Sequence, residues 1–134
     1  MKSRDTLVRL KRFQAEEKRR RVVQLNGMIA EFTRMANELE REIGQEERRA
    51  NISDLNHFAY PTYARAARAR RDNILASINE LRGQLDEAEA QFKEASEDLA
   101  KTQNQDARDR GAERMIDVVA DRRHAERPEA LRRA

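Results

Sequence analysis

Two stretches of the chain carry apolar residues that recur with a seven-residue period. The first contains Val22, Leu25, Ile29, Phe32, Ala36, Leu39 and Ile43, and the second contains Ile74, Ile78, Leu81, Leu85, Ala88, Phe92, Ala95 and Leu99. In both stretches the steps alternate between three and four residues, which places these side chains on one face of a helix. Each period lasts about four heptads, long enough to predict two helices that pair along a coiled-coil seam.

The segment between the two stripes breaks the period. Residues 51–63 read NISDLNHFAYPTY and contain Pro61, one of only 2 prolines in the chain. Proline is tolerated in the first turn of a helix, so the second helix is expected to begin at Pro61 or directly after it. The pattern therefore predicts a first helix over residues 1–50, a linker over 51–61 and a second helix over 62–106.

The period weakens at both ends of the chain. Residues 14–21 are almost entirely polar, so we expect the first helix to continue there loosely, through a stutter. Residues 107–134 are dense in charge and include Pro128, which stops a helix. We expect this tail to be frayed helix or disordered. It contains one apolar cluster, Met115, Ile116, Val118 and Val119.

The distribution of charge favours a chain that folds back on itself. Residues 1–21 contain nine Lys or Arg and three acids, whereas residues 80–106 contain eight acids and three bases. An antiparallel hairpin brings these blocks together, and a parallel pair would set like charges side by side. The fold class predicted is therefore all-α, an antiparallel two-helix coiled-coil hairpin with a short linker that contains aromatic residues.

Two registers of this hairpin set one stripe against the other. The first places Leu39 beside Arg71 and Lys18 beside Phe92. The second, one heptad away, pairs Leu25 with Phe92, and it also pairs Ile43 with Ile74, Leu39 with Ile78, Glu46 with Arg71 and Lys11 with Asp106. We prefer the second register because it leaves fewer charges in the seam and alternates large with small residues.

Composition excludes most chemistry. The chain has 134 residues, of which 40% are charged, 38% hydrophobic and 4% aromatic, so it lacks the apolar volume for a large core. It has no cysteine, and its 2 histidines, His57 and His124, have no metal-ligand spacing. There is no glycine-rich phosphate loop, and a two-helix hairpin offers no cleft that would shift a carboxylate pKa. We therefore expect no catalytic residue, no cofactor and no metal site.

Nucleic acid and membrane are not expected partners. The net charge is only +3, and the basic clusters at residues 18–21 and 68–71 each face acids across the hairpin. No apolar run approaches the roughly 20 residues of a membrane span, and the basic start lacks the apolar region of a secretory signal. We expect a cytoplasmic protein without direct membrane insertion.

Two groups of apolar residues are candidates for protein binding. The first is at the linker, the tip of the hairpin, and comprises His57, Phe58, Tyr60 and Tyr63. Two helices cannot bury all of these rings, although Phe58 and Tyr63 could instead close the end of the seam. The second is near the N-terminus and comprises Leu7, Leu10 and Phe13. Ordinary pairing with the distal half of the second helix is the alternative for this group.

The sequence also resembles a known family. Residues 2–13, KSRDTLVRLKRF, and the continuation EKRRR at 17–21 resemble the start of the FliJ family of flagellar export proteins. Residues 57–64, HFAYPTYA, resemble the linker of one branch of that family. The resemblance covers about residues 1–106 and not the tail.

The resemblance implies a component of the flagellar type III protein export apparatus, located in the cytoplasm at the base of the machine. FliJ proteins are antiparallel coiled coils similar to the stalk of rotary ATPases. The end with both termini enters the export ATPase ring and stimulates it, which would assign Leu7, Leu10, Phe13, Lys11 and Arg12 to the ATPase end. The cytoplasmic domain of the export-gate membrane protein and export chaperones are the other implied partners.

Two alternatives to this adaptor function follow from the residues. The first is a self-associating coiled-coil scaffold with no ATPase partner, which a concentration-dependent mass would reveal. The second is a basic coiled coil that binds nucleic acid, which a steep dependence of DNA binding on salt would reveal.

Overall fold

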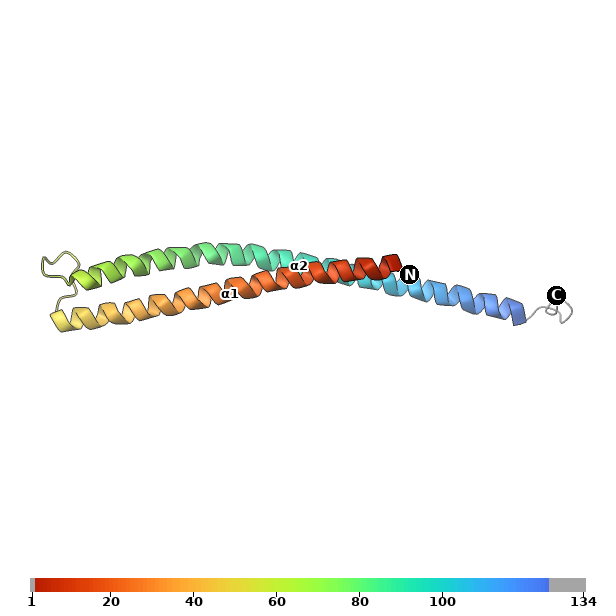
Figure 1. Cartoon of the computed structure of the whole chain (residues 1–134), viewed down its shortest axis with the longest axis horizontal. Helices are drawn as coiled ribbons and strands as arrows, with labels where there is room; N and C mark the ends of the chain where they lie inside the picture. Colours follow the sequence, from red (N-terminus) through yellow and green to blue (C-terminus); the bar gives the residue numbers. More distant parts are fainter. Residues whose placement is uncertain (1, 126–134) are drawn as a thin grey trace. The chain divides into compact units, whose positions relative to one another are not determined.

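The chain folds into two long α-helices. A computed structural model describes residues 2–125, in which α1 spans Lys2–Ala50 and α2 spans Thr62–Ala125 (Figure 1). The described residues contain no β-strand. The predicted all-α class, with two long helices packed against each other, is confirmed.

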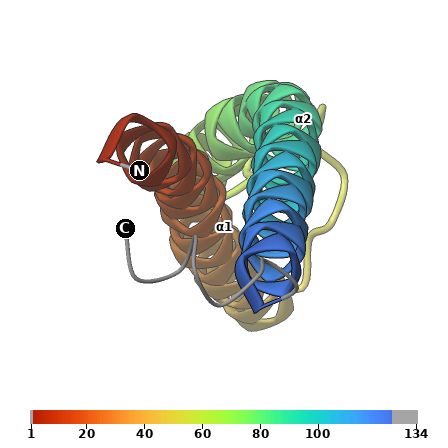
Figure 2. The same ribbon diagram turned by 90° about the vertical axis from the view of Figure 1, so that its right-hand side faces the viewer.

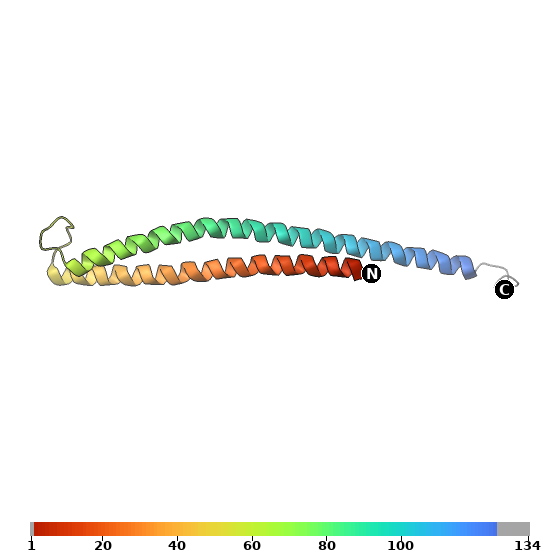
Figure 3. The same ribbon diagram turned by 45° about the horizontal axis from the view of Figure 1, so that its top comes forward.

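Packing between the helices divides the chain into two units. The linker unit consists of residues 16–93, and the described part of the terminal unit consists of residues 2–15 together with residues 94–125. In each unit a part of α1 lies antiparallel to a part of α2, and the two parts are side by side in both lateral views (Figure 1, Figure 3).

The apolar core lies in the linker unit. Leu25 packs with Leu81 and Ala88, and Ile43 packs with Ala67. Leu25 and Ile43 are each only 1% exposed, which makes them the largest fully buried side chains of the described residues. The other predicted seam residues are all buried or half-buried: Val22, Ile29, Phe32, Leu39, Ile74, Ile78, Leu81, Leu85, Phe92 and, in the terminal unit, Leu99.

The helices do not adopt the register that we preferred from the sequence. Arg71 Nη1 lies 2.5 Å from Glu40 Oε2, not beside Glu46. Lys18 Nζ donates to Gln91 Oε1 at 3.1 Å, next to Phe92. In the terminal unit, Lys11 Nζ lies 2.7 Å from Asp98 Oδ2, not beside Asp106. These contacts belong to the first register, with Leu39 at the level of Arg71, so the preferred register is wrong.

Buried residues at the start of α2 and directly before it explain this register. Tyr60, Ala64 and Ala67 continue the seven-residue period upstream of Ile74 and are 5%, 0% and 3% exposed. In the preferred register, Ala67 would lie level with the last residue of α1, and Tyr60 would lie beyond it in the linker. A shift of one heptad buries all three. It places Arg71 in the seam, which is tolerated because its stem covers apolar surface while its guanidinium reaches Glu40.

The seam of α1 continues to its N-terminus without the predicted stutter. Arg4, Val8, Lys11 and Ala15 follow one another at steps of four, three and four, and each is buried or half-buried. The sequence concealed this continuity because Arg4 and Lys11 are charged. Their aliphatic stems lie along α2, and their charged ends reach acids of that helix.

α2 also continues beyond residue 106, where a frayed or disordered tail was expected. Residues 107–125 are α-helical, and Arg110 Nε lies 3.1 Å from Asp106 Oδ2 one turn earlier. Most residues of this segment are good helix formers, so no seam partner is needed to continue the helix. The remaining residues of the expected tail, 126–134, lie outside the described part of the chain.

Ion pairs replace apolar contacts in the terminal unit. Ala15 is its only buried residue within the described part of the chain, at 7% exposed. Arg4 Nη2 lies 2.6 Å from Glu113 Oε1, and Lys11 Nζ lies 2.7 Å from Asp98 Oδ2. Arg110 and Asp5 form a further ion pair. Each such half-exposed pair contributes only about 0.2–1 kcal/mol.

Salt is therefore expected to weaken the terminal unit selectively. Raising ionic strength to about 1 M shortens the Debye length to roughly 3 Å, which screens these pairs but spares apolar packing. We expect amide hydrogen-exchange protection to fall about ten-fold in residues 2–15 and to remain or rise in residues 22–43. Exchange measured at low and high salt tests this prediction, and an equal fall in both segments would contradict it.

Candidate functional site

The two candidate surfaces belong to different units. The N-terminal surface, Leu7, Leu10 and Phe13, is in the terminal unit, and the tip surface around the linker is in the linker unit. Neither surface forms an enclosed cleft. Whether each can bind a partner therefore depends on which of its side chains are exposed.

Leu7, Leu10 and Phe13 form an exposed apolar stripe on α1. Their exposed fractions are 46%, 48% and 57%. They recur at steps of three, so the stripe winds around the helix from Leu7, which borders the seam residue Val8, to Phe13 on the opposite side. Other residues fill the seam there, so ordinary pairing with α2 does not account for Leu10 and Phe13. Three large apolar side chains remain available to a partner.

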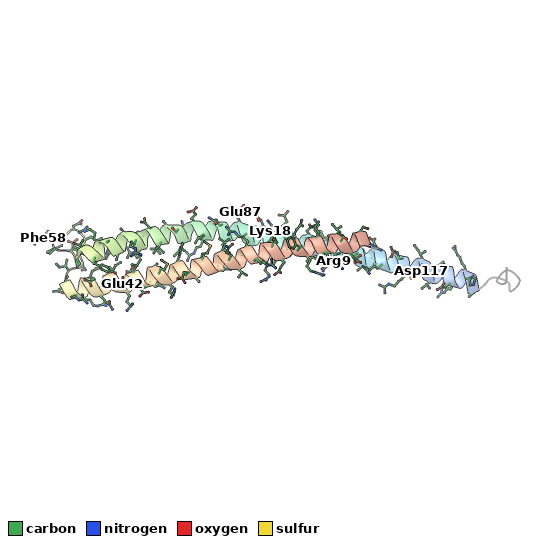
Figure 4. The ribbon with its side chains drawn as sticks, viewed as in Figure 1. Arg9, Lys18, Glu42, Phe58, Glu87 and Asp117 are labelled. Atoms are coloured by element: carbon green, nitrogen blue, oxygen red, sulfur yellow. The ribbon has the colours of Figure 1, made fainter. Side chains whose placement is uncertain are left out.

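The bases near this stripe have different roles. Lys11 is half-buried and holds Asp98, so it serves the hairpin and is not free for a partner. Arg12 is exposed, as is Arg9, whose side chain is labelled in Figure 4. The sequence pointed to Lys11 and Arg12 as a pair. Only Arg12, with Arg9, has the exposure that contact with an acidic rim of a partner requires.

At the other surface, α1 ends in a motif that turns the chain out of the helix. Asn51 has a φ of 57°, the left-handed conformation in which asparagine substitutes for glycine. Ile52 N donates to Glu47 O at 3.2 Å, which satisfies a carbonyl of the last turn. The linker is a loop outside the helical ribbons in every view (Figure 1, Figure 2, Figure 3).

Two tight turns shape the rest of the linker. Asn56 N donates to Asp54 Oδ1 at 2.9 Å and His57 N donates to Asp54 O at 3.1 Å. Tyr60 N then donates to His57 O at 3.1 Å. Arg65 N donates to Pro61 O at 3.1 Å, the first bond of α2. These bonds within the loop hold the backbone around Asn56, His57 and Tyr60 in place.

Tyr60 is not part of an exposed tip, contrary to expectation. It is 5% exposed because it lies in line with the seam directly before α2 begins at Thr62. Arg68 Nε donates to Tyr60 Oη at 2.8 Å, and Arg68 Nη2 donates to Glu47 Oε1 at 2.8 Å. The guanidinium of Arg65 lies 5.3 Å from the centre of the Tyr60 ring. Tyr60 therefore closes the end of the hairpin, the role that the sequence offered to Phe58 and Tyr63.

Phe58 is the most exposed large hydrophobic side chain of the described residues, at 97% (Figure 4). The ring of His57 stacks on it, with centroids 4.9 Å apart. Tyr63 is 54% exposed, and its hydroxyl donates to Glu42 Oε2 at 2.7 Å. That hydrogen bond raises the pKa of Tyr63, because the neutral phenol is the donor to the carboxylate.

The described residues contain neither a candidate metal site nor a candidate membrane span. They contain no group of three or more His, Asp or Glu side chains placed to hold a metal ion. No helix within 2–125 is long and apolar enough to cross a membrane. Exposed apolar side chains next to arginines are typical of surfaces that bind proteins.

One exposed apolar group was noted in the sequence but was not identified there as a candidate binding surface. Met115, Ile116, Val118 and Val119 were assigned to a frayed or disordered tail, but they lie on α2, where they are 64%, 68%, 46% and 40% exposed. Only their spacing in a continuous helix shows which of them share a face.

The fold thus defines an antiparallel two-helix hairpin with coiled-coil-like packing and exposed apolar groups outside its seam. No protein-family model matches the chain, and neither the curated proteins nor the solved structures include a match.

Proposed function

We propose that this protein is a stalk-like adaptor of the flagellar type III protein export apparatus and is not an enzyme. It binds and stimulates the export ATPase ring in the cytoplasm at the base of the export machine. Two features support the proposal: the resemblance of residues 2–21 and 57–64 to FliJ proteins, and an antiparallel helical hairpin of the kind that this family uses.

The observation that carries the proposal is the exposed stripe of Leu7, Leu10 and Phe13. These side chains are not needed for the seam, and exposing them without a partner costs free energy in water. Their position within the first 15 residues coincides with the part of the chain that the resemblance assigns to the ATPase ring. Arg9 and Arg12 add positive charge beside them.

The tip supplies a second contact in this proposal. Phe58, with His57 stacked against it, is a rigid aromatic projection of the kind that fills a pocket on a partner protein. The cytoplasmic domain of the export-gate membrane protein and export chaperones are the partners that the family resemblance proposes.

Replacing Leu10 and Phe13 with Ala is expected to weaken capture of the export ATPase at least about ten-fold, because both apolar contacts are lost. Stimulation of ATP turnover is expected to fall in parallel. A pull-down of the purified export ATPase, with ATP hydrolysis measured alongside, tests this. The helix content of the variant should not change, since neither residue packs in the seam.

The matched control is the double substitution of Val23 and Leu75 with Ala. Those side chains are 55% and 47% exposed, so the control also truncates two exposed apolar side chains, in this case in the linker unit. Capture by the wild type and control but not by the L10A/F13A variant supports the proposal. Failure of the wild-type protein to bind or stimulate the ATPase would refute it.

A further inference from the structure

A second apolar face lies on α2 beyond the start of α1. Six residues line a shallow groove there, Met115, Ile116, Val119, Ala120, Arg123 and His124. We call this groove the tail face. Figure 1 shows α2, in blue, extending past the N-terminal end of α1. The N-terminal surface is on the other helix, so the tail face is a separate site.

The tail face continues the seam that α2 forms with α1. Arg4 reaches three seam positions of α2: it lies 3.8 Å from Asp106, 3.8 Å from Asp109 and 2.6 Å from Glu113. The next seam positions, at steps of three, four and three, are Ile116, Ala120 and Arg123. Because α1 begins at Lys2, none of its described residues lies at the level of these positions.

We propose that the tail face binds the tail face of a second copy of this chain, with the two α2 helices antiparallel. The two α2 helices would pack antiparallel, as α1 and α2 do within one chain. The partner's α2 would occupy the seam of α2 beyond the N-terminal end of α1. A two-fold axis near residue 118 then sets Ile116 against the partner's Ala120, and Ala120 against the partner's Ile116.

Charge complementarity favours this arrangement. The same axis brings Glu113, which also pairs with Arg4 of its own chain, to the level of the partner's Arg123 at both ends of the contact. Asp117 borders the same side of the face as His124, and the antiparallel arrangement brings Asp117 towards the partner's His124. A parallel pair would instead set Glu113 against the partner's Glu113 and Arg123 against the partner's Arg123, which is unfavourable.

The flank opposite Asp117 adds apolar area. Met115 is 64% exposed and Val119 is 40% exposed, and an antiparallel pair brings Val119 near the partner's Val119. Only about three large side chains per copy become buried, well below a standard interface. The association is therefore weak, with a Kd on the order of 0.1 mM, and local concentration in an assembly would strengthen it.

Sedimentation equilibrium of the full chain at rising concentration tests self-association. The expected result is an average mass that increases from one chain towards two. Ile116→Asp should weaken the association at least about ten-fold, because it buries a carboxylate in the apolar contact. Val118→Asp is the matched control: Val118 is 46% exposed on the opposite face of the same turn, so the association should not change.

Circular dichroism must show that both variants keep the wild-type helix content. A wild-type mass of one chain at every concentration overturns the proposal, as does equal weakening by both substitutions. If the wild type stays monomeric while Ile116→Asp abolishes capture of the export ATPase, the face belongs to that ATPase instead. Because Leu10 and Phe13 lie on α1, failure of the proposed ATPase function leaves this test unaffected.

Disulfide formation tests the orientation, and the chain has no cysteine of its own. An equal mixture of the Ile116→Cys and Ala120→Cys variants should form the mixed disulfide in preference to either homodimer. Preferential formation of the Ile116→Cys homodimer would indicate a parallel pair and overturn the antiparallel proposal.

Discussion

Leu25→Ala and Ile43→Ala are each expected to destabilise the linker unit by about 2–5 kcal/mol, the cost of removing a fully buried aliphatic side chain. Both residues are 1% exposed and belong to different clusters of the seam. A hairpin has no further layer that could repack around the cavity. We expect the thermal midpoint, followed by circular dichroism at 222 nm, to fall by at least about 10 °C in each variant.

Leu75→Ala is the control for these two substitutions. Leu75 is 47% exposed on α2, outside the seam, so its truncation should change the midpoint by no more than a few degrees. A midpoint for Leu25→Ala or Ile43→Ala as high as that of Leu75→Ala would show that the seam does not hold the hairpin together.

Tyr60→Ala is expected to cost about 3–5 kcal/mol, as large aromatic truncations in cores do. The substitution empties the buried position directly before α2 and leaves Arg68 without its bond to the Tyr60 hydroxyl. It also removes the ring over which the Arg65 guanidinium lies. Urea unfolding curves should show a lower midpoint with little change in slope, because the surface exposed on unfolding is nearly the same.

Two further variants separate the contributions at the linker. Tyr60→Phe retains the ring and loses only the hydrogen bond from Arg68 Nε, so we expect about 1–2 kcal/mol. Phe58→Ala should be neutral for stability, because that side chain is 97% exposed. If Phe58→Ala destabilised the hairpin more than Tyr60→Ala, the assignment of these two rings would be reversed.

The neutrality expected of Phe58→Ala makes it useful for function. A substitution that leaves the fold intact reports directly on binding, so loss of a gate or chaperone contact could be attributed to the ring itself. Tyr60 cannot serve this purpose, since any effect on binding would be mixed with unfolding of the hairpin end.

Two long helices, the linker between them and most of the seam could be predicted from the sequence. A seven-residue apolar period specifies which face of a helix is buried whatever the partner is, so Leu25 and Ile43 could be identified before the structure was known. The break at residues 51–61 could also be predicted, since Pro61 and a cluster of turn-forming residues interrupt a chain otherwise rich in helix formers.

Register, the exposure of individual aromatics and the extent of α2 were decided only by the tertiary structure. Shifting the hairpin by one heptad keeps every seam position in the seam, so periodicity cannot distinguish the two registers. Burial of Tyr60, Ala64 and Ala67 against the end of α1 distinguishes them, and it also leaves Phe58 in solvent. Charged residues at seam positions, such as Arg4 and Lys11, look like a break in the period because sequence does not show an aliphatic stem lying along a neighbouring helix.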